Sequence, residues 1–178
     1  YMQHYYNPVH RSTRVPRTRW CVMRYPNQAM AALAKMSVEA FENFYFDACL
    51  VDYAKMCEAM TPLKELMERT DKVRIIAPGT DLAFSIKGIP AIKCCGEVNI
   101  PDGEVYTAPV KNSINGVVQF NTDTVYNGIF FSNVRLVFKD GRITEASSLA
   151  NNDKLQDILE TDAGSRYMAV SYTHLRAH

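Results

Sequence analysis

The period of the hydrophobic pattern changes near Asp71, and this change constrains the fold more than any other feature of the sequence. Before Asp71, apolar residues recur at helical spacing. After it, short alternating runs typical of strands are separated by turns. The pattern therefore predicts an α+β fold, with a helical segment followed by a β-rich segment. A fold of this class does not by itself specify a function.

Three helical segments are predicted in the first part of the chain. One spans residues 28–36, and the next follows Ser37, a residue type that favours the N-cap position. The third spans residues 52–69 and contains Pro62, which must kink the helix or start a new one capped by Thr61. The buried stripe expected on the second helix consists of Phe41, Phe44, Tyr45, Ala48 and Cys49.

In the second part of the chain, the sequence pattern predicts short strands and one final helix. The strand-like runs lie at residues 73–78, 81–88, 99–110, 116–120, 133–138 and 142–146. Asp140 and Gly141 separate the last two runs and form the strongest hairpin signal noted in the chain. A helix is predicted over residues 153–159.

Composition places the chain among ordinary globular proteins, as one domain or parts of two. It has 178 residues, of which 47% are hydrophobic and 22% charged, so extended disorder is not expected. No apolar run of about 18 residues predicts a membrane span, and no signal peptide is recognised. Residues 1–38 carry six basic and no acidic residues. Because no nucleic-acid-binding motif accompanies these arginines, we expect no nucleic-acid partner. Because no apolar run is long enough to span a membrane, we expect no membrane partner.

The cysteines and histidines do not form a recognisable ligand pattern. The five cysteines have no C-x-x-C spacing and predict free thiols in a reducing cytoplasm rather than a disulfide framework: Cys21, Cys49, Cys57, Cys94 and Cys95. The adjacent pair Cys94 and Cys95 should point to opposite faces of a strand, which favours packing over a shared metal. His4 and His10 lie in a turn-rich arm without zinc spacing.

Glu104 is the one side chain whose position asks for an explanation. It lies in NIPDGEVYTAPV (99–110), between a Pro-Asp-Gly turn and a β-prone run. Glutamate is a poor strand former, and a carboxylate inside a sheet must be compensated. These residues alone favour a solvated strand-edge position, with ligand binding as the alternative. We interpret Asp102 and Asp81 as turn residues.

Several long runs resemble one enzyme family. They are RIIAPGTDLAFSIKGIPAI, NIPDGEVYTAPVKNSINGVVQFN, VRLVFKDGRI and LETDAGSRYM, together with TRWCVMRYPNQAMAALAKMSVEAFENFYFDACLVDYAKM upstream. The chain is similar over roughly residues 9–168 to the aminopeptidase T / aminopeptidase S / PepS family of bacterial metalloaminopeptidases, which use a two-metal centre. Members of this family are more than twice as long as this chain.

The resemblance implies a division of the chain. Residues 1–71 would be the C-terminal, mainly helical part of an N-terminal α/β domain. Residues 72–170 would be the first part of the catalytic domain. Residues 171–178 show neither helical nor strand period and resemble a translated adapter tail, so we expect them to be non-native.

The resemblance also implies metal ligands. Glu104 matches the first ligand, and its metals would be two divalent ions, zinc, cobalt or manganese. The second ligand belongs to a Gly-Glu pair expected at residues 169–170, where this sequence reads Ala169-Val170. The family's later histidine, tyrosine and aspartate ligands would lie beyond the end of the chain. Asp102 could support the ligand Glu104, although the turn interpretation is favoured.

The function implied is hydrolysis of N-terminal residues from peptides by metal-activated water. The parent enzyme would be a cytoplasmic homodimer, and this truncated chain would be inactive, with no catalytic residue assigned. The alternative is a non-enzymatic β-rich interaction domain that pairs through exposed strand edges.

Overall fold

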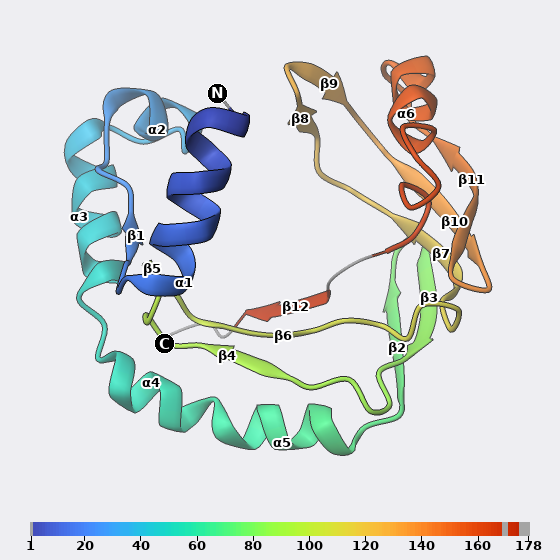
Figure 1. The fold of residues 1–178 in the computed structure, drawn as a ribbon. Coiled ribbons are helices and arrows are strands. Elements are labelled where there is room, and N and C mark those ends of the chain that lie inside the picture. Colours follow the sequence, from blue (N-terminus) through green and yellow to red (C-terminus); the bar gives the residue numbers. More distant parts are fainter. Residues whose placement is uncertain (1, 169–170, 175–178) are drawn as a thin grey trace. The chain divides into compact units, whose positions relative to one another are not determined.

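The structure is a computed structural model that describes residues 2–168 and 171–174. Its described residues form two compact units, each built from separate stretches of the chain. Of the described residues, the first unit comprises 2–61, 93–104 and 174, and the second comprises 62–92, 105–168 and 171–173. Helices and strands both contribute substantially, which confirms the α+β fold class (Figure 1).

The first unit is mainly helical. Its helices are η1 (Met2–Arg14), α1 (Val15–Arg17), α2 (Gln28–Leu33), α3 (Val38–Cys49) and α4 (Tyr53–Ala59). Two short strands, β1 (Val22–Met23) and β5 (Asn99–Ile100), pair in parallel. The strands β4 (Ile92–Cys94) and β6 (Glu104–Thr107) carry the chain across the boundaries of the units.

Helix α3 begins where its cap residue predicts. The Ser37 hydroxyl accepts a hydrogen bond from the backbone N–H of Ala40 at 3.2 Å, which satisfies one of the unpaired donors of the first turn. Phe41 and Tyr45 are buried together with Ala31 of α2. Phe44 is 62% exposed, so the prediction that it belongs to the buried stripe is wrong. The covered face of α3 is narrower than the spacing of its apolar residues suggested.

The predicted helical segment 52–69 is divided into two helices. Helix α4 ends at Ala59, and α5 (Thr61–Arg69) begins with Pro62 in its first turn, where a missing N–H costs nothing. Met60 lies between the helices and is fully buried. The break confirms that a new helix starts beside Pro62. The prediction that Thr61 caps this helix is wrong, because Thr61 is its first residue and donates its hydroxyl to the Cys57 carbonyl at 3.4 Å.

The N-terminal arm is helical, and the prediction of a turn-rich arm around His4 and His10 is wrong. Helix η1 is a π-helix that contains Pro8. In a π-helix, backbone hydrogen bonds join residues five apart. The side-chain hydroxyls of Ser12 and Thr13 have the same spacing, because they donate to the backbone carbonyls of Asn7 and Pro8. His10 stacks at 4.8 Å against the ring of Tyr6.

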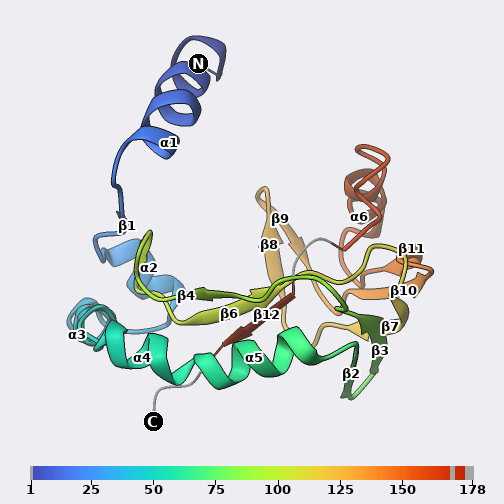
Figure 2. The ribbon, with the colours of Figure 1, turned by 60° about the horizontal axis from the view of Figure 1, so that its bottom comes forward.

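The second unit is built on an antiparallel five-stranded sheet with strand order β11-β10-β7-β3-β2 (Figure 2). The strands are β2 (Lys72–Ala77), β3 (Thr80–Ser85), β7 (Asn115–Gln119), β10 (Arg135–Lys139) and β11 (Arg142–Ser147). Helix α6 (Asn152–Leu159) contributes Leu155 and Leu159 to the apolar core. The other buried members of that core are Leu82, Phe84, Ile86, Ile114, Phe131, Phe138 and Ile143.

Two hairpins in this unit have the same turn chemistry. Asp140 and Gly141 connect β10 to β11 with φ of 49° and 84°, the backbone that the Asp-Gly signal predicts. Asn127 and Gly128, with φ of 51° and 78°, connect β8 (Thr124–Tyr126) to β9 (Ile129–Phe131). The sequence analysis did not single out this second turn, although Asn-Gly is an equally strong hairpin signal.

The chain forms one further strand, β12 (Ser171–His174), in a three-stranded sheet with the order β12-β6-β4. Residues 171–174 form this strand although their sequence shows no strand period, because backbone pairing does not require a hydrophobic period. Residues 175–178 lie outside the described part of the chain. Among the described helices, none has the length and apolar character needed to cross a membrane.

Candidate functional site

Glu104 is the first residue of β6 and lies on the more accessible face of that strand. Val105 and Thr107 are buried, at 0% and 5% exposure, whereas Glu104 is only partly buried. This is the alternation expected of a strand with one covered face. The carboxylate of Glu104 is thus held by a strand backbone without being enclosed in the core.

The turn before Glu104 is fixed by hydrogen bonds to Asp102. One carboxylate oxygen of Asp102 accepts from the backbone N–H of Gly96 at 2.8 Å, and the other accepts from that of Gly103 at 3.1 Å. The backbone N–H of Asp102 donates to the Tyr53 hydroxyl at 3.3 Å. Asp102 therefore has the backbone-bonding geometry of a turn residue.

A pocket of about 270 Å³ opens beside this turn, within the first unit. The parallel pairing of β1 with β5 aligns Val22 with Asn99 and Met23 with Ile100, and Arg24, which follows β1, reaches the same pocket. The backbone N–H of Arg24 donates to the Tyr45 hydroxyl at 3.1 Å. The pocket is lined by Val22, Arg24, Tyr45, Asn99, Ile100, Pro101, Asp102 and Glu104.

Three carboxylates near this turn act on the thiol of Cys94. Burial raises the pKa of the Cys94 thiol, and the carboxylates of Asp102, Glu104 and Glu97 raise it further. Within the described residues, none of these three carboxylates forms an ion pair with a lysine or an arginine. A group of carboxylates without a cationic partner favours the binding of a cation.

A complete two-ion centre is not assembled by the described residues. The single group of three close His, Cys, Asp or Glu side chains among them does not include Glu104. Glu104 fits a divalent ion chemically, because it offers hard carboxylate oxygens on an accessible strand face. The positions of Ala169 and Val170, where the second ligand was expected, lie outside the described residues.

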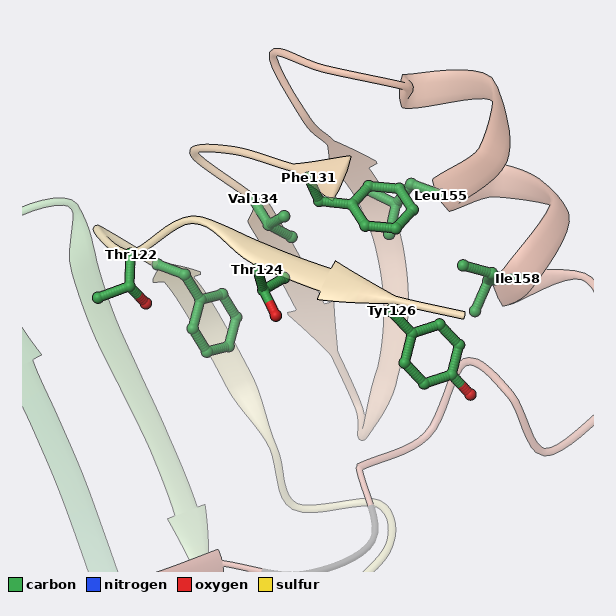
Figure 3. Close-up of a pocket in the computed structure, with 8 residues that line it drawn as sticks. Thr122, Thr124, Tyr126, Phe131, Val134, Leu155 and Ile158 are labelled. Carbon is green, nitrogen blue, oxygen red and sulfur yellow. The ribbon is translucent and has the colours of Figure 1, made fainter. Parts of the chain in front are cut away.

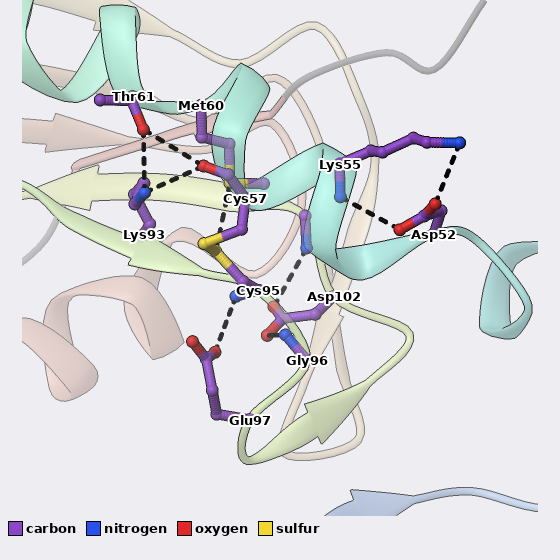
Figure 4. Close-up of a disulfide and its surroundings, with 11 residues drawn as sticks. Asp52, Lys55, Cys57, Met60, Thr61, Lys93, Cys95, Gly96, Glu97 and Asp102 are labelled. Atoms are coloured by element: carbon purple, nitrogen blue, oxygen red, sulfur yellow. Dashed lines mark hydrogen bonds and ion pairs between the residues drawn. A yellow bond between two sulfur atoms is a disulfide. The ribbon is translucent and has the colours of Figure 1, made fainter.

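A disulfide between Cys57 and Cys95 lies next to this turn (Figure 4). Helix α4 and the segment after β4 bring the two Cα atoms to 5.3 Å, within the range that a disulfide requires. The prediction of free thiols is therefore wrong for these two residues and confirmed for the other cysteines, which are Cys21, Cys49 and Cys94. The partners are 38 residues apart, and no local spacing signals such a pair.

Asp81 has a different role from the turn residue we predicted. It lies in β3 and accepts two hydrogen bonds from Arg74 on the neighbouring strand, at 2.8 and 2.7 Å. The Arg74 guanidinium lowers the pKa of the Asp81 carboxyl below its usual range. Asp81 thus forms a cross-strand ion pair on the surface of the second unit.

A larger cavity, of about 370 Å³, lies in the second unit (Figure 3). Its walls come from the β8–β9 hairpin, helix α6 and nearby strands. The lining side chains are Phe120, Thr122, Thr124, Tyr126, Phe131, Val134, Leu155 and Ile158. Since no carboxylate, imidazole or thiol lines it, this cavity offers no metal ligand and no general base that works near neutral pH.

Sequence reasoning identified Glu104 and Asp102 but missed the residues that position them. Tyr53 is 49 residues before Asp102, and Arg24 and Tyr45 come from elements still earlier in the chain. No periodic pattern connects residues this far apart. The Pro-Asp-Gly-Glu stretch was the one local signal of the site.

The described structure and sequence are similar to known proteins of one family. The model of the thermophilic metalloprotease family (M29) matches residues 2–169. Aminopeptidase AmpS of Bacillus subtilis is 33% identical over 101 residues, which cover 52% of this chain and 25% of AmpS. Aminopeptidase PepS of Streptococcus thermophilus is 28% identical over 168 residues, which cover 83% of this chain and 39% of PepS.

Two solved structures share the fold. AmpT from Thermus thermophilus matches with a TM-score of 0.64 and 22% identity, over 84% of this chain and 40% of AmpT. A 2,5-dihydroxypyridine dioxygenase from Pseudomonas putida matches with a TM-score of 0.59 and 14% identity, over 84% of this chain and 48% of the dioxygenase. Because one of these structures is named as a dioxygenase whereas AmpS and PepS are named as aminopeptidases, the fold alone does not decide the reaction.

The chain spans well under half the length of the relatives it matches. The family match nevertheless extends over nearly all of its 178 residues. It includes the turn before Glu104 and the segments that supply Tyr53 and Arg24. The chain belongs to the thermophilic metalloprotease family (M29).

Proposed function

We propose that this chain is part of a metal-dependent aminopeptidase in which Glu104 is a metal ligand. The observation that carries the proposal is the position of Glu104, at a strand start in a pocket with Asp102, without an ion-pair partner in the described part of the chain. The family membership and the aminopeptidase relatives support peptides as the substrate.

The metal chemistry proposed is that of a two-ion hydrolase. Two divalent ions, zinc, cobalt or manganese, would activate a water and polarise the scissile carbonyl. Of this chain's own residues, Glu104 would hold an ion, and Asp102 would keep the Glu104 turn in place through Gly96 and Gly103. Tyr53 would anchor the same turn from helix α4.

The proposal includes the organisation of the parent protein. Residues 1–71 would complete an N-terminal α/β domain, and residues 72–170 would begin the catalytic domain, with the remaining ligands farther along the parent chain. The 178-residue chain would then be inactive, since one carboxylate cannot hold two ions. We further propose a homodimeric parent and a cytoplasmic location, the latter supported by three free thiols and the bacterial aminopeptidase relatives.

The proposal is tested with the reading frame extended beyond Met168 and with the 178-residue chain. We expect the extended protein to release N-terminal residues from peptides in the presence of zinc, cobalt or manganese, and the shorter chain to show no turnover. In the extended protein, Glu104→Gln should lower kcat/KM at least ~100-fold, because it removes a metal ligand. Glu58→Gln, an exposed glutamate on α4, is the matched control and should retain activity.

Two outcomes would overturn the proposal. Full activity of the Glu104→Gln variant would remove Glu104 from the metal site. Metal-dependent turnover by the 178-residue chain alone would show that the site is complete without further ligands.

An interaction domain is the second candidate function. The specific observation is β2, an edge strand of the five-stranded sheet on which Ile76 is 70% exposed. An exposed apolar edge strand can pair with a strand of another chain. A concentration-dependent change in mass by analytical ultracentrifugation that Ile76→Lys abolishes would support this function for the isolated chain.

A further inference from the structure

A cluster of two sulfurs and one carboxylate lies in the first unit, separate from Glu104. The Sγ atoms of Cys57 and Cys95 and a carboxylate oxygen of Glu97 all lie within 4.8 Å of one another. In the part of the chain that the structure describes, no other three His, Cys, Asp or Glu side chains meet this closely. Thiolates and carboxylates are both ligands of zinc and related divalent ions.

The surroundings give this cluster one apolar side and one open side. Cys95 is buried, and its Sγ lies 3.8 Å from Sδ of Met60, which is fully buried. Glu97 is exposed, so solvent reaches the cluster from its side. A tetrahedral ion held by three protein ligands would take a water as its fourth ligand on this open side.

The carboxylate of Glu97 is already oriented toward the cluster. One of its oxygens, Oε2, accepts a hydrogen bond from the backbone N–H of Cys95 at 2.9 Å (Figure 4). The other oxygen accepts no hydrogen bond from the residues that the structure describes, so it can bind an ion. A ligand oriented by a hydrogen bond of this kind loses less conformational freedom when it binds a metal.

The charge around the cluster also suits a divalent ion. Two thiolates and one carboxylate carry three negative charges, which a divalent ion reduces to one. The ammonium of Lys93 lies beside Cys57, where it donates to the Cys57 carbonyl at 2.9 Å and to the Thr61 hydroxyl at 3.0 Å. Lys93 thus adds one positive charge next to the backbone of Cys57, opposite in sign to the net charge of the loaded cluster.

We propose that, when the Cys57–Cys95 disulfide is reduced, Cys57, Cys95 and Glu97 bind one thiophilic divalent cation such as zinc. Binding deprotonates the two thiols and releases two protons. Disulfide formation prevents binding: two electrons pass from the two thiols to an oxidising disulfide such as glutathione disulfide, which becomes two thiols. The same two sulfurs thus either bond to each other or hold the ion. The site shares no residue with the Glu104 pocket and does not depend on the proposed peptidase activity.

The test uses the 178-residue chain, stripped of metal and reduced with a phosphine. Titration with cadmium, read by the ultraviolet thiolate-to-metal charge-transfer band, should reach its end point at about one ion per chain. Cys57→Ser and Cys95→Ser should each remove the band, and Glu97→Gln should weaken binding by ~10-fold or more. The disulfide-bonded chain should show no band.

Two control variants locate the ion. Cys94→Ser, at the neighbouring free thiol, and Glu39→Gln, at an exposed carboxylate of α3, should leave the band and its end point unchanged. A band that survives in Cys57→Ser, disappears in Cys94→Ser, or forms equally in the disulfide-bonded chain would overturn the proposal. The absence of any band in the reduced chain would overturn it as well.

A second measurement keeps the test valid if a serine variant fails to fold. Zinc should slow the alkylation of Cys57 and Cys95 in the reduced wild-type chain by ~10-fold or more, measured by mass spectrometry of the labelled peptides. The exposed thiol of Cys21 serves as an internal reference and should react at the same rate with and without zinc. Equal alkylation rates of Cys57 and Cys95 in both conditions would contradict a metal site.

Discussion

The turn before Glu104 and the β10–β11 hairpin are both short segments with a glycine at positive φ, yet different forces hold them in place. The hairpin packs the apolar side chains of Phe138 and Ile143 into a core. The Glu104 turn is held by hydrogen bonds to Asp102 and by a disulfide between distant residues. The hairpin is thus specified by local alternation, whereas the turn depends on residues brought in from other elements.

The largest loss of stability is expected in the apolar core into which the β10–β11 hairpin packs. Phe138 is 4% exposed in the core, so Phe138→Ala should lower the free energy of unfolding by about 3–5 kcal/mol through lost burial and a residual cavity. Denaturant unfolding followed by circular dichroism measures this loss. Phe130→Ala is the matched control, because Phe130 is 45% exposed, and it should cost much less. Equal losses in the two variants would contradict the burial difference.

Removing the Cys57–Cys95 disulfide should destabilise the turn before Glu104 and leave the stability of the β10–β11 hairpin unchanged. Closing a loop between partners 38 residues apart contributes about 4 kcal/mol at most, by the loss of unfolded-chain entropy. Cys57→Ser should therefore speed amide hydrogen exchange in α4 and in residues 95–103, with little change in β10 and β11. Cys94→Ser is the control at a free thiol. Uniformly faster exchange across the chain would show that the two regions unfold together.

The hairpin turn itself tolerates no side chain at Gly141. Its φ is 84°, and an added Cβ would collide with the backbone carbonyl of Lys111. We expect Gly141→Ala to cost about 2–3 kcal/mol of unfolding free energy. Gly88 has a φ of 74°, but the space around an added Cβ is open. Gly88→Ala should therefore lower the free energy of unfolding by only about 1 kcal/mol. A thermal-melt series that ranks Gly88→Ala as the more damaging variant would refute the steric argument.

The smallest effect is expected at the surface ion pair of Asp81. Arg74 lowers the pKa of the folded Asp81 carboxyl, so the pair stabilises the fold above the ordinary aspartate pKa of 3.8. That contribution is lost as the pH falls through the lowered pKa of the folded state. Asp81→Asn should slightly reduce the melting temperature at pH 7 and remove this part of the acid dependence. An unchanged acid dependence of melting would show that the pair contributes nothing.

The fold was largely predictable because its signals are local. Ser37 as a cap, the helix break at Pro62 and the Asp140–Gly141 turn each rest on a few neighbouring residues, and the structure confirms all three. Phe44 was wrongly placed in a buried stripe, because periodicity predicts a face but not how much of it another element covers.

The site was predictable only as far as its local motif extends. The Pro-Asp-Gly-Glu stretch and the family resemblance pointed to Glu104, and Asp102 has the turn geometry expected of it. Asp81 was misread, since its partner Arg74 is on another strand. The disulfide was missed for the same reason: a spacing of 38 residues carries no pattern.

The sequence by itself determined the α+β class, most of the helices and strands, the family, and Glu104 as the residue that we propose to bind a metal. Only the tertiary structure decided what surrounds Glu104. It placed Tyr53 and Arg24 beside the turn of Asp102, and it brought Cys57 to Cys95 and Glu97. Helix and turn preferences act between neighbours, whereas a binding site depends on contacts between residues that are distant in the chain and adjacent only after folding.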